Sequence, residues 1–229
     1  MGKQELLGWF AFHFGPIYIS PTLLTSGLLT ILLGVLSWLA TRHLRVVDPT
    51  PLQVTLEGIV TTIDEAIRSV LPQQSATVLP FIATLWLFIG AANLIGVLPG
   101  LRAPTGDLAV TAALAVLVFL SVHWFGIRSA GLGNYLRHYL SPNPLLLPFH
   151  LLSEISRTLA LALRLFGNIM SLELAALLVL LVAGALAPVP LLLLHVIEAL
   201  IQAYIFGMLA LIYVAGAMQS HQLRKQANP

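Results

Sequence analysis

The segment Leu159-Ala-Leu-Ala-Leu-Arg164-Leu-Phe-Gly-Asn168 places an arginine inside a run that is otherwise apolar enough to cross a membrane. Most residues from 160 to 186 are leucine, alanine, valine or isoleucine, so we expect a membrane helix with Arg164 far from either polar surface. An arginine at the centre of such a helix costs about 3 kcal/mol on insertion scales and roughly 10–17 kcal/mol in simulations. It is therefore either functional or a structural cation neutralised by a carboxylate of its own helix bundle.

Composition identifies the class of protein. The 229 residues are 58% hydrophobic and 9% charged, whereas about 25% of the residues of a soluble domain are charged. We predict an all-α polytopic membrane protein with a single domain over residues 1–229, because membrane spans satisfy their polar groups only against one another or against partners. The absence of cysteine excludes disulfides, a thiol nucleophile and a cysteine-ligated metal site.

Apolar runs of about 20 residues predict about five membrane helices. We expect an outer N-terminal segment at residues 1–22, a first span at 23–40, a second span at 78–98 and a third span at 108–125. Residues 145–218 hold two longer apolar segments, which we expect to form a long tilted hairpin. The first of these would reach roughly 60 Å, twice the hydrocarbon thickness, so it must tilt, kink or leave the membrane. Gly167 and Gly184 are candidates for bending or close packing.

The segment 52–71 differs from the spans because its apolar residues recur at spacings of three and four. Charged and polar residues lie between them: Gln53, Glu57, Asp64, Glu65 and Arg68. This pattern predicts an amphipathic helix on a membrane surface or on a partner.

Basic residues predict the orientation, because they are enriched on the cytoplasmic side of membrane proteins. With five crossings and the N-terminus outside, only Lys3 and Arg102 lie outside, and Arg164 lies within the membrane. The other eight basic residues are then cytoplasmic: Arg42, Arg45, Arg68, Arg128, Arg137, Arg157, Arg224 and Lys225. We therefore expect the C-terminus in the cytoplasm.

Polar residues of the last apolar segment are predicted to share one helix face. His195, Glu198 and Gln202 are spaced three and then four residues apart, and Tyr213 continues this face about three turns on. A lone histidine in such a helix is often a structural hydrogen-bonding group. Three polar side chains on one face each need a partner or water, which favours a functional interpretation.

Glu173 follows Arg164 by nine residues, which at about 100° per residue is roughly half a turn around the helix. The two charges therefore face different surroundings and are not a self-neutralising pair on one face. We interpret them as a fixed cation on one side and, on the other, a carboxylate that meets the polar face of the last segment. Such an arrangement suits an ion path that feeds a site on another protein.

Three blocks of the sequence resemble subunit a of F-type ATP synthases. The first runs from Ser156 to Asn168 and is followed by Glu173, the second runs from His195 to Phe206, and the third is Asn93-Leu-Ile-Gly-Val-Leu-Pro99 with Pro104-Thr105 after it. The resemblance covers about residues 78–220. Gly96 stands where the family often has an acidic residue, so the family's acidic site on the second span is not expected here.

The resemblance implies roles for individual residues. Arg164 matches the essential stator arginine, which faces the ion-binding carboxylates of the rotating ring of c subunits. Glu173, His195 and Gln202 match positions that line the outer half-channel or support the arginine. Asn168 matches the asparagine of the signature, and Glu154 an acidic position near the cytoplasmic entrance.

Other candidates rest on weaker arguments. Glu198 and Tyr213 depend only on the shared helix face. Thr105 and Asp107 either line an entrance or belong to an ordinary polar loop. Asn93 either makes an interhelical hydrogen bond or contributes to a channel.

The resemblance also implies a function: an ion-translocating stator subunit that couples proton or sodium flow to ring rotation. The implied setting is a hetero-oligomeric complex in the bacterial inner membrane, with one copy of this chain beside the c-ring, the peripheral-stalk b subunits and lipid. The chain has no Gly-x-x-x-x-Gly-Lys loop, so we expect no catalysis by the chain itself. We also expect no cofactor, metal or nucleic acid.

Two alternatives remain. A stand-alone ion channel or secondary transporter would use the same intramembrane polar residues, although it should show repeat symmetry or helix breaks at a substrate site. A purely structural scaffold would explain the hydrophobicity but not the polar residues within the spans.

Overall fold

The computed structural model describes residues 13–14, 17–18, 21–42, 44–45, 48–97, 103–135, 147–184 and 189–227. Most of the predicted outer segment 1–22, and the basic residues Lys3, Arg102 and Arg137, lie outside the described residues. The predicted fold class is confirmed, because the described chain is helical and five of its helices are long and apolar enough to cross a membrane. The chain is a multi-pass membrane protein. The sequence analysis did not anticipate the short antiparallel pair of β1 (His13–Phe14) and β2 (Ile17–Tyr18).

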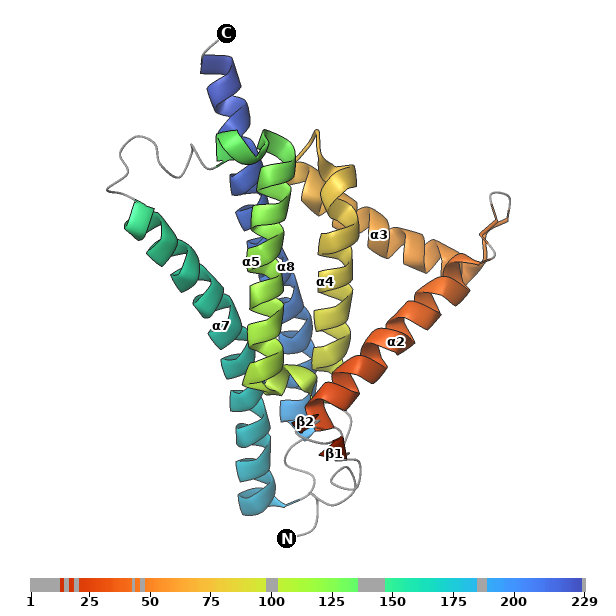
Figure 1. Cartoon of the computed structure of the whole chain (residues 1–229). Helices are drawn as coiled ribbons and strands as arrows, with labels where there is room; N and C mark the ends of the chain where they lie inside the picture. The colour runs from red at the N-terminus through yellow and green to blue at the C-terminus, as the bar shows by residue number, and fades with distance from the viewer. Residues whose placement is uncertain are drawn as a thin grey trace.

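The first two helices form a V beside the main bundle (Figure 1). α2 (Pro21–Thr41) covers the predicted first span, and α3 (Pro51–Val70) covers the predicted amphipathic segment except Leu71, which caps the helix. Gln53 fixes the corner between them, because its side chain accepts from the Arg45 backbone N–H and donates to the Arg45 carbonyl, both at 3.0 Å. At its other end α3 is tied to the bundle by Gln219, whose amide donates to the Val70 carbonyl at 2.9 Å.

α4 (Ser75–Ile95) and α5 (Leu108–Ala130) run antiparallel in the middle of the bundle, with the short 3₁₀ helix η1 (Pro104–Gly106) between them in the chain. α5 extends past residue 125, where we expected the span to end. The helix continues through Arg128, which can reach polar surroundings from the last turn, and it stops at Gly131, whose φ of +80° is left-handed. Charge alone was therefore a poor marker of its end.

α7 (Leu147–Ala183) and α8 (Val189–Ala227) are the two longest helices and run antiparallel. At 1.5 Å per residue each is roughly 55–60 Å long, as the apolar segments required. Gly184 neither bends the helix nor packs closely; with φ +82° it ends α7, and its N–H bonds the Leu180 carbonyl at 3.2 Å. A Cβ added at Gly167 would meet none of the described residues within 4 Å, so Gly167 does not bring two of the described helices close together.

The core lies where α4, α5, α7 and α8 meet. Its fully buried large side chains include Ile82, Ile89, Val118, Leu165, Phe206 and Leu211. By contrast, α2 and the outer faces of α7 and α8 expose many large apolar side chains, as expected of surfaces that contact lipid or other membrane subunits. This packing fixes α7 and α8, which carry most of the candidate site.

Candidate functional site

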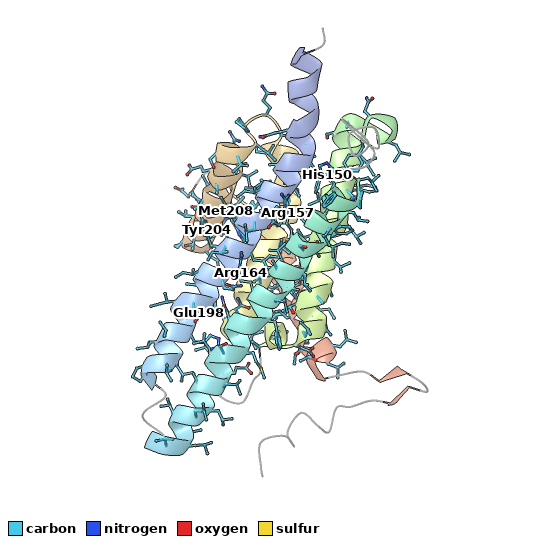
Figure 2. The ribbon with its side chains drawn as sticks, turned by 90° about the vertical axis from the view of Figure 1, so that its left-hand side faces the viewer. His150, Arg157, Arg164, Glu198, Tyr204 and Met208 are labelled. Atoms are coloured by element: carbon cyan, nitrogen blue, oxygen red, sulfur yellow. The ribbon has the colours of Figure 1, made fainter. Side chains whose placement is uncertain are left out.

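Arg164 lies near the middle of α7, 17 residues after Leu147 and 19 before Ala183. Its side chain is exposed, and the neighbouring Leu159 and Leu163 are exposed as well. Figure 2 shows Arg164 between the positions of Arg157 on α7 and Glu198 on α8. Within the described part of the chain, no carboxylate lies within the 4.0 Å of an ion pair from Arg164. The bundle therefore presents a cation on an apolar outer face.

The structure gathers polar groups on both sides of Arg164. We call the end of the bundle where α2 and α5 begin the N-side, and the end where α8 finishes the C-side (Figure 1). Toward the N-side lies a group that we name the N-side cluster: Asn93, Thr105, Asn168, Glu173, His195 and Gln202. Toward the C-side lies a cavity, named the C-side cavity.

The N-side cluster is linked by hydrogen bonds between helices. Thr105 of η1 donates to Asn93 Oδ1 at 2.6 Å, and Asn93 Nδ2 donates to the Ala199 carbonyl of α8 at 3.3 Å. Asn168 of α7 donates to Gln202 Oε1 at 2.7 Å. Because Ala199 and Gln202 are neighbours on α8, the two links connect α4, η1 and α7 through that helix.

Two buried nitrogens of the N-side cluster carry no such bond. His195 is 4% exposed and Gln202 1% exposed, and neither His195 Nε2 nor Gln202 Nε2 has a hydrogen-bond partner among the described residues. Buried polar atoms are almost always satisfied by protein or ordered water. These two nitrogens are therefore candidates to bind ordered water or a group of a partner.

Glu173 lies on the part of α7 that η1 approaches. Its Oε1 would be 3.3 Å from a Cβ built on Gly106, so a glycine allows the close approach of η1 to this carboxylate. Glu173 is half-buried, whereas Arg164 is exposed. Glu198 lies between His195 and Gln202 on the polar face of α8. It is also half-buried and lies nearer the N-side than Gln202, which is buried.

Asp107 has structural partners on both oxygens. Oδ1 accepts from the Ala109 backbone N–H at 2.9 Å and caps α5, and Oδ2 accepts from the Thr22 hydroxyl of α2 at 2.6 Å. These bonds tie α2 to the start of α5. They favour the structural interpretation of Asp107 over a channel entrance.

The C-side cavity has a volume of about 490 Å³ and lies between α5, α7 and α8. Apolar side chains of α5 and α8 form part of its wall, and its polar lining consists of Tyr135, His150, Ser153, Glu154, Arg157, Thr158 and Tyr213. The Arg157 guanidinium lies 5.6 Å from the centre of the Tyr213 ring, a cation–π contact. By periodicity Tyr213 falls on the same face of α8 as His195. It lies much further along this helix, however, so it lines the C-side cavity and does not belong to the N-side cluster.

Sequence reasoning missed two histidines near this cavity. His150 lines it, and His123 of α5 places Nε2 3.6 Å from Glu154 Oε1. The sequence did offer a signal for His123, because it is the one ionisable residue in the predicted third span. Without the fold, however, nothing paired it with Glu154, 31 residues away and on another helix.

Comparison with known proteins identifies the family. Residues 23–215 match the family described as the ATP synthase A chain. ATP synthase subunit a 2 of Pelobacter propionicus is 61% identical over 214 residues, which are 93% of this chain and 93% of the relative. ATP synthase subunit a of Legionella pneumophila is 55% identical over 226 residues, covering 99% of this chain and 98% of the relative. ATP synthase subunit a 1 of Hahella chejuensis is 60% identical over 207 residues, covering 90% and 88%. The chain belongs to the ATP synthase A chain family.

Proposed function

We propose that this chain is the ion-translocating stator subunit of a rotary F-type ATP synthase. In this proposal it does not make ATP itself; it supplies two aqueous half-channels and a fixed arginine that faces the carboxylates of the c-ring. The family and the names of the relatives support the assignment to an ATP synthase. The coupled ion is a proton or sodium.

The observation that carries the proposal is the exposure of Arg164 on an apolar face at mid-helix. A guanidinium left in lipid is costly, and no partner within the described chain offsets that cost. A carboxylate on a neighbouring subunit would offset it. A ring of c subunits passing this face would bring one carboxylate after another opposite Arg164.

The chemistry follows from charge and solvation. A ring carboxylate that faces lipid favours its neutral or cation-bound form, because an apolar environment disfavours bare charge. Opposite Arg164 the ionised form is stabilised, so the ion is released into one half-channel and the next site reloads from the other. The same positive charge repels ions that would cross directly between the half-channels. Each elementary charge that moves through about 100 mV releases about 2.3 kcal/mol, which rotation accumulates.

We assign the outer half-channel to the N-side cluster and the inner one to the C-side cavity. Glu173, His195 and Gln202 are then outer-channel residues supported by Asn168, with Asn93 and Thr105 holding the helices together and Glu198 at the margin. Glu154 and Tyr213 belong to the inner channel. The basic residues of the sequence favour this orientation, with the C-side in the cytoplasm of a bacterial cell.

The proposed partners are the c-ring on the exposed face of α7 and α8, and the peripheral-stalk b subunits near α2 and α3. One copy of the chain is expected in each complex. The exposed apolar surface of α2 is consistent with a membrane partner or lipid.

Substitution of Arg164 tests the proposal. In vesicles that carry the whole complex, Arg164→Ala should abolish ion-driven ATP synthesis while passive ion leak persists or rises. Arg164→Lys should not restore synthesis, because an ammonium lacks the delocalised fork and loses its proton more readily. Arg128→Ala, which removes an exposed charge in the last turn of α5, is the matched control and should keep normal synthesis.

Coupled synthesis in the Arg164→Ala vesicles would refute the stator-charge mechanism. Vesicles that contain this chain alone separate the proposal from the alternative. A stand-alone channel or transporter would pass ions without the ring, whereas a stator subunit should not.

A further inference from the structure

The short helix η1 is held tightly against the end of α4. Thr105 is fully buried and donates to Asn93 Oδ1 at 2.6 Å. Ala103, directly before η1, is 1% exposed and lies against Gly96. A Cβ added to Gly96 would be 2.8 Å from the Cβ of Ala103, which is too close for two carbon atoms without a bond between them. The glycine at position 96 therefore allows η1 to pack this closely on α4.

The other end of η1 is fixed by Asp107. Its carboxylate caps α5 through the Ala109 backbone N–H and accepts from the Thr22 hydroxyl of α2. Because η1 is bonded to α4 at one end and to α2 and α5 at the other, it cannot shift without breaking these contacts.

Gly106, between these two ends, faces α7. A Cβ added to it would lie 3.3 Å from Glu173 Oε1 and 3.5 Å from Ile169 Cγ2. Ile169 is 0% exposed, so it cannot move aside within the packed interior. Glu173 is half-buried, so its side chain is the neighbour that can move. A methyl group at position 106 would therefore press on the Glu173 carboxylate.

The same methyl group would also change the hydration of this carboxylate. Gly106 and Glu173 both keep part of their surface exposed, so solvent reaches the contact. A hydroxyl donor lies about 2.7–2.8 Å from the oxygen that accepts its hydrogen bond. A methyl group 3.3 Å from Oε1 would take part of the space in which water or an ion approaches that oxygen.

We propose that η1 is a positioning element for the Glu173 carboxylate and that Gly106 is its positioning residue in contact with that side chain. Gly96 acts one step further away, because it sets how closely η1 packs on α4. The inference rests on the proposed function and deepens it: Glu173 meets the ion that enters on the N-side, and η1 controls how readily the ion reaches it.

Ion-driven ATP synthesis tests the positioning in vesicles that carry the whole complex. When the soluble head faces the bath, the N-side faces the lumen. The lumen is loaded with a series of sodium concentrations and, in a second series, of proton concentrations, under a fixed membrane potential. The rates give a maximal rate and a half-saturating concentration for the ion that drives the wild type. Gly58→Ala is the matched control, because a Cβ there would meet none of the described residues within 4 Å.

Gly106→Ala should raise the half-saturating concentration at least about threefold and keep the maximal rate within about a factor of two, because more ion compensates for weaker capture at Glu173. Gly96→Ala should also raise it, since the new Cβ displaces Ala103 and η1 with it. Ala103→Gly removes the opposing Cβ and should restore the wild-type value in the Gly96→Ala chain. Gly58→Ala should match the wild type.

The outcomes separate the two proposals. Wild-type vesicles that make no ATP with either ion would overturn the proposed function and this inference with it. Wild-type synthesis together with an unchanged half-saturating concentration in Gly106→Ala vesicles would overturn the inference alone, and so would a loss of maximal rate only. If immunoblots find too little of the Gly106→Ala chain in the membrane, the Gly96→Ala chain decides the question: an unchanged value, or one that Ala103→Gly fails to restore, would overturn the inference.

Discussion

Gly207 allows α4 and α8 to pack closely, and replacing it with alanine should destabilise the bundle. Trp86 of α4 places its indole against the α8 backbone at this glycine, and a Cβ added there would overlap the indole Nε1. The indole N–H donates to the Tyr204 carbonyl at 3.2 Å, and the two rings stack with centres 5.7 Å apart and planes inclined by 18°. Trp86 is among the buried side chains of the core, so the indole cannot move aside without disturbing its neighbours.

The magnitude can be worked from these contacts. Overpacking a core by one methyl group costs about 1–3 kcal/mol when side chains must leave their preferred positions. Displacing the indole also breaks its hydrogen bond, which is worth about 1 kcal/mol. We therefore expect Gly207→Ala to lower the free energy of unfolding by about 2–4 kcal/mol.

Gly90 offers a matched control in the same interface. A Cβ added at Gly90 would lie 3.7 Å from the Cβ of Ala203, an ordinary contact, so Gly90→Ala should be neutral or slightly stabilising. Unfolding of the detergent-solubilised chain by SDS, followed by circular dichroism, gives both values. Replacing Trp86 by leucine in the Gly207→Ala background should recover part of the loss, because the overlapping atoms are gone. Equal stability of the Gly207→Ala and Gly90→Ala chains would refute the reasoning.

Two further predictions concern the outer access and the topology. Glu173→Leu and His195→Leu should slow ion-driven turnover of the assembled complex while leaving the amount of chain in the membrane largely unchanged; turnover at the normal rate across the pH range would make both residues structural. Cysteines placed at Glu57 and Asp64 of α3 should react with a membrane-impermeant reagent added from the cytoplasmic side, because α3 lies at the C-side of the bundle. Labelling only from the outside would reverse the proposed orientation.

Much of the fold was predictable because a membrane limits what a chain can form. Apolar runs of sufficient length must become helices, since only helices satisfy their own backbone within lipid. The three/four periodicity of apolar residues from 52 to 71 distinguished α3 from the spans, because a helix with charged residues along one face lies on a surface and does not cross the membrane. The limits of the helices were less predictable: α5 ends at Gly131 and α7 at Gly184 because these residues adopt positive φ, and composition does not reveal backbone conformation.

The sequence predicted which candidate residues share a helix face, but it did not predict which residues of different helices contact each other. Periodicity places His195 and Gln202 on one face of α8, and both are buried on it. Periodicity says nothing of the Asn168–Gln202 bond, the contact of Arg157 with Tyr213, or the approach of His123 to Glu154. Those contacts depend on how α5, α7 and α8 pack, which is set by many apolar side chains together.

The packing between the two polar regions supports the proposal that this chain works with a partner subunit. On α7 the buried side chains between Arg157 and Asn168 are Leu161, Ala162 and Leu165, which are 2%, 4% and 0% exposed. On α8, Phe206 fills the corresponding level and is 1% exposed. This apolar layer spans about two helical turns, roughly 10 Å, and the described side chains that form it offer an ion no polar partner. Arg164 lies at the same level but on the outer face. If ions pass between the C-side cavity and the N-side cluster, as we propose, the apolar layer would force them to leave the bundle and to be carried past Arg164 by another subunit. In the proposed function a rotating ring of carboxylates would perform that transfer, and the apolar layer would prevent the ion from crossing without it.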